Sequence, residues 1–511
     1  MGSADGRRDA DRTAGGGLLP AHPAKPRRRP HGRLGQGLTA AVASTTAQLA
    51  DRCLLPGFVG TRAPDWVRRR AAAGLGGVVL YGRNVESPEQ LRRLTDDLHS
   101  ERPGLLVSID EEGGDVTRLE VRTGSSYPGN LALGQAGDLE LTRAVAFAMG
   151  SELAATGIDL DLAPDADVNS NPANPVIGVR SFGAQPALVA AHTAAFVEGL
   201  QGAGVAACAK HFPGHGDTST DSHLELPVAA EDPRLGALEP FRAAIAAGVR
   251  SIMSAHLLVP VLDSVPATLS HRILTQLLRD ELGFGGLVIT DGLEMRAISD
   301  GVGIAEGAVG ALVAGCDALC IGGGLAEESI VDELRDAILE AVRSGRLSEE
   351  RLAEAAGRVD SLAAWRAERQ PAPAAQRGVG LEAARRAVQV EGPVRAGADA
   401  LVVQLRPGAS MAVGAVAWGI APPALSFDGP PVDVDGVLRR AEGRGLVLVV
   451  RDLHRHAWQA DAVEALLARR PDAVLVEMGL PARRPARAGS YVSTFGAGRV
   501  NGQAAAERVL S

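Results

Sequence analysis

The chain has 511 residues and a formal net charge of −9 at pH 7, with 46% hydrophobic and 22% charged residues. This composition is typical of a folded globular protein and excludes wholesale disorder, and the length favours two domains. The net charge of −9 is spread along the chain and forms no basic face, and the short run Arg27–Arg29 is more simply a solvated extension than a site for an acidic partner. We therefore expect no nucleic acid among its partners.

The first 42 residues differ in composition from the rest of the chain. Residues 1–42 are rich in Gly, Arg, Pro and Ala without periodicity, so we interpret them as a disordered tail. They contain no apolar signal-peptide core, and no run of about 18 apolar residues that could span a membrane is found along the sequence. Cys53, Cys208, Cys316 and Cys320 stand in apolar surroundings and are too few for a disulfide framework. These features predict a cytoplasmic protein.

From residue 43 onward, short apolar runs alternate with amphipathic helical segments. The expected strands lie at 77–81, 105–109, 158–162, 205–209, 251–254, 287–290 and 318–321. Expected helices between and after them lie at 141–156, 188–201, 238–247 and 352–366. Such alternation indicates a parallel sheet. Seven or eight units over ~300 residues favour a closed, TIM-like (β/α)8 barrel, which we place at 43–366.

A Pro-Ala-Pro sequence marks a linker at 367–379, and a smaller α/β domain is expected at 380–511. Its expected strands lie at 400–404, 446–450 and 473–477, with helices at 459–468 and 502–510. The polar residues of this domain form no pattern that we can assign to chemistry. The predicted fold class is thus α/β, with a TIM-like barrel followed by a smaller α/β domain.

Residues 210–223 concentrate three histidines, two aspartates and a lysine in fourteen positions directly after an expected buried strand. Glycine and proline bend the chain into a loop there, and titratable side chains on such a loop suit proton transfer. Two alternatives remain open, a solvated polar loop and a metal site. The histidines lack the cysteine partners and the helical His-x3-His spacing of the usual metal sites.

Three further stretches place polar side chains after expected strands, where the mouth of a barrel gathers catalytic groups. Asp291 ends an apolar strand, and its alternative role is to cap the next helix. Residues 110–114 read Asp-Glu-Glu-Gly-Gly and are followed by Arg118, with a solvated acidic turn as the alternative. Residues 164–183 include Arg180, whose guanidinium suits binding of hydroxyls or carboxylates or, alternatively, a surface salt bridge.

Taken together, these motifs resemble glycoside hydrolase family 3, specifically its bacterial β-N-acetylglucosaminidase branch. The Lys-His-Phe-Pro-Gly-His-Gly-Asp-Thr…Asp-Ser-His signature is matched by residues 210–223. The Asn-Pro-Val-Ile-Gly…Arg-Ser-Phe-Gly element is matched by residues 174–183. Pro-Ala-Thr-Leu-Ser at 266–270 and Leu-Gly-Phe at 282–284 are similar to further landmarks. The resemblance covers residues 45–365, and the C-terminal domain resembles a second domain of some members only weakly.

The resemblance implies a retaining exo-β-N-acetylglucosaminidase that releases terminal N-acetylglucosamine from muropeptides or chitooligosaccharides through a covalent glycosyl-aspartate. By motif position, Asp291 is the nucleophile, His223 the general acid/base and Asp221 the carboxylate that orients His223. The residues that match the sugar-binding positions are Asp110, Arg118, Arg180, Lys210 and His211. A histidine that titrates near neutrality can serve as the proton donor, and a nearby aspartate can fix its tautomer.

We expect no cofactor and no metal. The resemblance implies a glycan containing N-acetylglucosamine as the partner and a role in cell-wall recycling. One position departs from the family pattern, because Asp115 follows the double glycine where an arginine is usual, whereas Arg118 is kept. Two other functions remain open. A β-N-acetylglucosaminide phosphorylase is one, since a histidine acid/base leaves room for phosphate. A catalytically silent sugar-binding protein is the other, and Asp115 is the feature that favours it.

Overall fold

The computed structural model describes residues 45–369, 376–420 and 425–511, and the expected tail at 1–42 lies outside the described residues. We call residues 45–369 the barrel lobe and the remaining described residues the C-terminal lobe. Helix α11 ends the barrel lobe at Ala367, and helix α12 begins at Val379. No helix among the described residues has both the length and the apolar character to cross a membrane.

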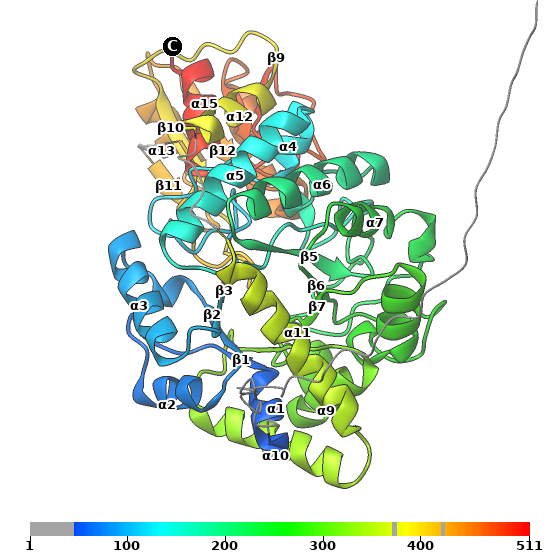
Figure 1. Cartoon of the computed structure of the whole chain (residues 1–511). Helices are drawn as coiled ribbons and strands as arrows, with labels where there is room; N and C mark the ends of the chain where they lie inside the picture. Colours follow the sequence, from blue (N-terminus) through cyan, green and yellow to red (C-terminus); the bar gives the residue numbers. More distant parts are fainter. Residues whose placement is uncertain (1–44, 370–375, 421–424) are drawn as a thin grey trace, which may run out of the picture. The chain divides into compact units, whose positions relative to one another are not determined.

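Eight parallel strands follow one another through the barrel lobe (Figure 1). They are β1 (Leu54–Pro56), β2 (Gly77–Leu80), β3 (Leu106–Ile109), β4 (Leu160–Asp161), β5 (Ala206–Phe212), β6 (Ser251–Ser254), β7 (Leu287–Thr290) and β8 (Leu319–Ile321). Strands β2 to β7 pair in chain order, β1 pairs with β8, and Ile289 of β7 bridges to Ala318 beside β8. Since β1 also lies beside β2, the strands form a ring. The predicted TIM-like barrel is confirmed.

Helices separate the strands and surround this sheet. They are α1 (Thr46–Arg52), α2 (Asp65–Ala73), α3 (Pro88–Glu101), α4 (Asn130–Ala136), α5 (Leu139–Ala155), α6 (Pro186–Gly202), α7 (Glu239–Ala246), η5 (Arg272–Glu281), α8 (Arg296–Ser299), α9 (Ile304–Ala314), α10 (Glu328–Arg343) and α11 (Glu349–Ala367). Several begin at a side-chain cap. The Ser87 hydroxyl accepts from the Gln90 N–H at the start of α3, and Asp138 accepts from the Leu141 N–H at the start of α5.

Alternating side chains along the strands build two apolar layers. Val79 of β2 and Leu106 of β3 belong to the cluster inside the barrel, whereas Val78 and Val107 pack in the larger cluster that includes the surrounding helices. This follows from the two-residue period of a strand, because both faces of a barrel sheet are buried. The strands are therefore rigid supports for the residues at their ends.

Strand β5 extends further than the sequence indicates. The expected run ends at residue 209, yet Lys210 and His211 continue the strand to Phe212. The Lys210 N–H donates to Pro164 O at 3.1 Å, and the Ala166 N–H donates to Lys210 O at 2.6 Å. These contacts with the segment after β4 hold both polar residues on the sheet instead of on the loop.

The C-terminal lobe is a six-stranded sheet with helices, which confirms the smaller α/β domain. Its strands are β9 (Gln389–Glu391), β10 (Leu401–Leu405), β11 (Leu425–Phe427), β12 (Leu446–Val450), β13 (Val474–Glu477) and β14 (Ser490–Ser493). Its helices are α12 (Val379–Ala387), α13 (Val434–Arg440), α14 (Ala457–Arg469) and α15 (Arg499–Val509). The order is β11-β10-β12-β13-β14-β9, and only the β14–β9 pair is antiparallel. Helix α12 packs against α4 and α5 of the barrel lobe and against α15.

Asp115, the residue that departs from the family pattern, joins the two lobes. Its buried carboxylate accepts from the Ala497 N–H at 2.7 Å and pairs with Arg451 at 2.5 Å. The Arg451 guanidinium also lies over the ring of Trp418, 5.8 Å from its centroid. Burial raises the pKa of Asp115, and the Arg451 cation opposes this shift. The carboxylate at this position therefore serves the contact between the lobes.

Candidate active site

A cavity of about 800 Å³ lies at the carboxyl ends of the barrel strands. The predicted site residues that line it are Asp110, Arg118, Arg180, Lys210, His211, His223 and Asp291. The remaining residue, Asp221, is hydrogen-bonded through Oδ1 to Nδ1 of His223. The structure thus brings together the eight predicted site residues, although they come from stretches far apart in the chain.

The barrel topology explains this convergence. Asp110 follows β3 directly, Asp291 follows β7 directly, and Lys210 and His211 lie in β5 just before its last residue, Phe212. Arg180 ends a short 3-10 turn, η2 (Gly178–Arg180), in the connection after β4. Because parallel strands of a barrel all end at the same face, residues at these ends meet above the sheet.

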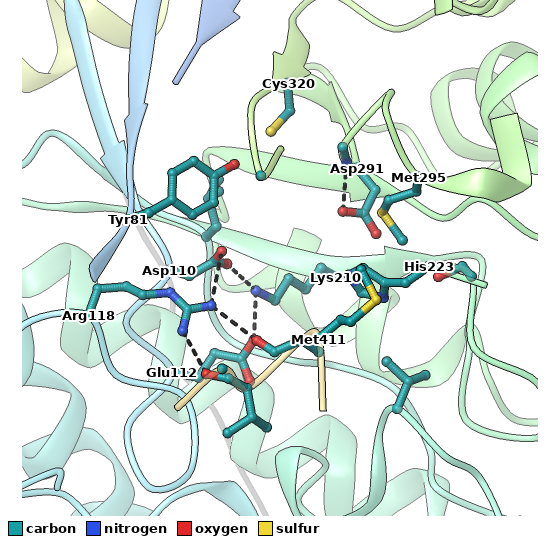
Figure 2. A pocket seen from close by; sticks show the side chains of 18 of the residues that line it. Tyr81, Asp110, Glu112, Arg118, Lys210, His223, Asp291, Met295, Cys320 and Met411 are labelled. Carbon is teal, nitrogen blue, oxygen red and sulfur yellow. Dashed lines mark hydrogen bonds and ion pairs between the residues drawn. The ribbon is translucent and has the colours of Figure 1, made fainter. Parts of the chain in front are cut away.

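Four charged residues form a network at one end of the cavity (Figure 2). Lys210 Nζ lies 2.7 Å from both Asp110 Oδ1 and Glu112 Oε1. Arg180 binds Glu112 in a bidentate manner, with Nη2–Oε1 at 2.7 Å and Nε–Oε2 at 2.9 Å. Burial alone would raise the pKa of Glu112, but the Arg180 and Lys210 cations hold it well below its usual range. The network is a fixed set of opposite charges, and Asp110 is its member that remains partly exposed to the cavity.

His211 is oriented by Asp167, a residue of the stretch after β4. Asp167 Oδ2 lies 2.7 Å from His211 Nδ1, and Asp167 Oδ1 accepts from the His215 N–H at 2.6 Å. Burial, with a smaller effect of the Arg180 cation, lowers the pKa of His211 to about 4. The imidazole is therefore neutral at pH 7, with Nδ1–H donating to Asp167 and Nε2 as the acceptor atom, 3.5 Å from Arg180 Nη2.

The same region contains the one group of side chains, among the described residues, with metal-ligand spacing. The ligand atoms of Asp165, Asp167 and His211 all lie within 4.8 Å of one another. However, Arg180 Nη2 already lies 3.7 Å from Asp165 Oδ2, and both oxygens of Asp167 are engaged with imidazole and backbone N–H groups. Burial raises the pKa of both carboxyls, to about 8 for Asp165, so the arrangement favours orientation of His211 over metal binding.

Asp291 lies at the other end of the cavity, where its Oδ1 accepts from the Gly292 N–H at 2.8 Å. Burial alone would raise the pKa of Asp291. The neighbouring imidazoles of His211, His256 and His223 and the Gly292 N–H outweigh this effect and lower the pKa to about 2. Asp291 is thus ionised at pH 7. The alternative role as a helix cap is wrong, because α8 begins after Met295 and Met295 occupies the cap position.

His223 and Asp221 form the pair expected from the sequence. His223 Nδ1 lies 2.7 Å from Asp221 Oδ1, which also accepts from the His223 N–H at 2.9 Å. Burial alone would lower the pKa of His223, but the hydrogen bond with Asp221 and the charges of Asp291 and Asp221 raise it above the ordinary value for histidine. With Nδ1–H held by Asp221, the Nε2 atom is the one available for proton transfer in the cavity.

Comparison with known proteins identifies the family to which the chain belongs. The family model described as "Glycosyl hydrolase family 3 N terminal domain" matches residues 64–362. The chain belongs to glycosyl hydrolase family 3. The resemblance recognised from the sequence motifs, and the enzyme class that it implied, are thereby confirmed.

Three relatives illustrate how the family match extends along the chain. A β-hexosaminidase of Alkalilimnicola ehrlichii is 41% identical over 277 residues, which cover 52% of this chain and 78% of that protein. β-Hexosaminidase A of Pseudoalteromonas piscicida is 36% identical over 317 residues, so the match spans 56% of this chain and about half (53%) of that relative. A solved family 3 β-N-acetylglucosaminidase from Paenibacillus sp. str. FPU-7 has a TM-score of 0.82 and 34% identity, covering 90% of this chain and 96% of that one.

Two features of this family 3 site were not predicted from the sequence. Glu112 connects Lys210 to Arg180, yet it stands in an acidic run where only its neighbour Asp110 was singled out. Its position two residues beyond Asp110, in the same Asp-Glu-Glu motif, was the available signal. The second feature is a wall from the C-terminal lobe, made by residues 411–416. Its backbone carbonyls accept hydrogen bonds from Arg118. Because every residue has such a carbonyl, the residue types in this segment do not indicate the contact.

Proposed function

We propose that this family 3 member is a retaining exo-β-N-acetylglucosaminidase. The observation that carries the proposal is the shared cavity, in which an ionised carboxylate and an Asp-paired histidine lie at one end and a network of charged side chains at the other. The names of the relatives, β-hexosaminidase and β-N-acetylglucosaminidase, support N-acetylglucosamine as the sugar. The partner is then a glycan with a terminal β-linked N-acetylglucosamine.

In the first step, the Asp291 carboxylate attacks the anomeric carbon and forms a glycosyl-aspartate. The bond from the anomeric carbon to the leaving oxygen breaks, and protonated His223 gives its Nε2 proton to that oxygen. Asp221 stabilises the imidazolium by accepting from Nδ1–H. The raised pKa of His223 favours the protonated form that this step requires.

In the second step, a water molecule hydrolyses the glycosyl-aspartate. Neutral His223 now accepts a proton from the water, whose oxygen bonds to the anomeric carbon while Asp291 leaves as a carboxylate. The product keeps the β configuration, and both residues return to their starting protonation states. His223 thus acts as the acid in one step and as the base in the next.

The charged end of the cavity suits recognition of sugar hydroxyls. Asp110 can accept from hydroxyl groups, Lys210 and Arg180 can donate to them, and neutral His211 can accept at Nε2. Arg118 lies 3.8 Å from Asp110 and completes the set. We assign the binding of the terminal sugar to these five residues, as the sequence resemblance implies.

We place the enzyme in the cytoplasm, where it would act on muropeptides released from the cell wall, with chitooligosaccharides as a second substrate. The negative net charge of −9 supports a glycan, and not a nucleic acid, as its partner. The argument for a silent sugar-binding protein loses its basis, because Asp115 has a role at the contact between the lobes.

The test is to incubate the purified protein with 4-nitrophenyl β-N-acetylglucosaminide, with and without inorganic phosphate. We expect nitrophenolate and free N-acetylglucosamine at a rate independent of phosphate. Formation of N-acetylglucosamine 1-phosphate would instead support the phosphorylase alternative, for which the histidine acid/base is the structural argument. If neither product forms under conditions in which the sugar binds, the catalytic proposal is overturned.

A further inference from the structure

The C-terminal lobe enters the cavity through one segment, Ser410–Val416, which we call the strap. It lies in the connection from β10 to β11, and Met411 through Val416 line the cavity. Its sequence from residue 411 is Met-Ala-Val-Gly-Ala-Val, so none of these side chains carries a hydrogen-bond donor or an acceptor of ordinary strength. The Met411 side chain is 65% exposed, which places it at the open margin of the cavity and not in the core.

The strap is held on the barrel lobe by two backbone contacts with the loop after β3. Arg118 Nη1 donates to Val413 O and Arg118 Nη2 to Ala412 O, both at 3.1 Å. At the far end of the strap, the Ala417 N–H donates to Val121 O at 2.9 Å. Val413 itself is 6% exposed, so the middle of the strap is packed. These anchors hold the strap as a fixed wall.

The strap lies at the hydroxyl-binding end of the cavity. Its anchor Arg118 is 3.8 Å from Asp110 Oδ2, and Asp110 binds Lys210 at 2.7 Å. Figure 2 shows Arg118 and Asp110 on the side of the cavity away from Asp291. In a pyranose ring, C1 and C4 occupy opposite positions. A sugar whose C1 meets Asp291 therefore directs its 4-hydroxyl toward the end where the strap is anchored.

We propose that the strap sets the requirement for a free 4-hydroxyl on the sugar, and so for a terminal residue. An apolar wall without polar side chains offers nothing to replace the hydration of a second sugar unit attached at O4, and the exposed Met411 stands at the margin of that wall. The two carbonyls also fix the Arg118 guanidinium beside Asp110. This inference rests on the proposed function and adds to it a specificity determinant from the C-terminal lobe.

The experiment compares 4-nitrophenyl β-N-acetylglucosaminide with its 4-O-methyl derivative, which differs by one methyl group at the oxygen in question. The quantity measured is the ratio of the two kcat/KM values. Met411→Ala opens the margin of the wall, and a second variant replaces residues 410–414 by two glycines. Val390→Ala is the matched control, because Val390 is also an exposed apolar side chain of the C-terminal lobe but lies on β9 and not in the strap.

We expect the wild type and Val390→Ala to reject the methylated substrate equally. In Met411→Ala, the ratio of kcat/KM for the unmethylated over the methylated substrate should fall by about tenfold, which is the effect of a small change in the steric fit of a site. The variant with the shortened strap should lower this ratio further. An unchanged ratio in Met411→Ala, with a melting temperature like that of the wild type, would overturn the inference. If the wild type hydrolyses neither glycoside, the proposed function fails, and calorimetric binding of N-acetylglucosamine and its 4-O-methyl derivative to the same variants then tests the strap by itself.

Discussion

The two ends of the cavity are built in opposite ways. At the hydroxyl-binding end, the side chains of Lys210 and Glu112 are each 3% exposed and that of Arg180 is 7% exposed, and ion pairs connect all three. At the reaction end, His223 is 23% exposed and stands on an irregular loop, with Asp221 as its carboxylate partner. In the proposed mechanism, rigid groups of the barrel locate the sugar, whereas the proposed proton donor has room to adjust. Changes at the two ends should therefore affect different quantities.

The largest loss of activity is expected from Asp291→Ala. Without the nucleophile, turnover should fall by about four orders of magnitude, as in other enzymes that lose the group forming the covalent intermediate. The melting temperature should stay close to that of the wild type, because the burial cost of the charge disappears together with its favourable interactions with the imidazoles and the Gly292 N–H. Kinetics with a 4-nitrophenyl glycoside and a thermal melt check both points. Activity near that of the wild type would remove Asp291 from the mechanism.

Glu112→Gln is the corresponding change at the rigid end, and it should lower both stability and activity. The glutamine keeps the shape of the side chain but leaves the buried cations of Lys210 and Arg180 without their shared anion. Breaking a buried ion pair in this way costs about 3 kcal/mol of the free energy of unfolding. Urea unfolding of this variant beside Asp291→Ala makes the comparison direct. If Glu112→Gln and Asp291→Ala have the same free energy of unfolding, the charged end of the cavity is not the more rigidly held of the two ends.

His223→Ala should show a loss that depends on the leaving group. A nitrophenolate departs with little protonation, whereas the alkoxide of a disaccharide requires a proton donor. We expect a loss of about tenfold on the nitrophenyl glycoside and about a thousandfold on N,N′-diacetylchitobiose. Asp221→Ala should show the same bias more weakly, since the imidazole remains. Equal losses on the two substrates would indicate that His223 binds sugar instead of donating a proton.

The smallest effect expected is a shift in the pH profile of Asp221→Asn. The Asp221 carboxylate contributes to the raised pKa of His223, and His223 must be protonated to act as the acid. A raised pKa keeps the acid form present at higher pH, so the alkaline limb of kcat/KM lies at higher pH in the wild type. Asparagine removes the charge, and the limb should move to lower pH. A limb that does not move would show that another group controls it.

The sequence predicted the parts of the structure that depend on local patterns. Alternating apolar runs located seven of the barrel strands, and motifs at strand ends located the residues around the cavity. Strand β1 (Leu54–Pro56) was missed because three residues carry too little pattern, and its pairing with β8 is a tertiary effect. Strand β9 is wholly exposed and antiparallel, so it has no apolar run to detect.

Contacts between the lobes could not be predicted for a different reason. The motif comparison singled out Asp115, but nothing local indicates that its partners are Arg451 and the Ala497 N–H. The position of the strap could not be predicted for the same reason. Arg118 donates to backbone carbonyl oxygens of the strap and not to its side chains. Such pairings depend on how two lobes dock, which a single sequence does not encode in residue type or spacing.

The strand order of the C-terminal lobe explains where the contacts of Arg118 and Asp115 lie on its sheet. From β10 the chain moves to one side of the sheet for β11 and to the other for β12, and open α/β sheets bind small ligands in the crevice at such a reversal, beyond the carboxyl ends of the strands. Here the strap lies in the segment that leaves β10, and Arg451 directly follows β12. Both reach the loop after β3 of the barrel lobe, at Arg118 and Asp115. The barrel loop thus lies where an open α/β sheet would bind a ligand, and mutations in that crevice are expected to alter the proposed sugar site of the barrel lobe.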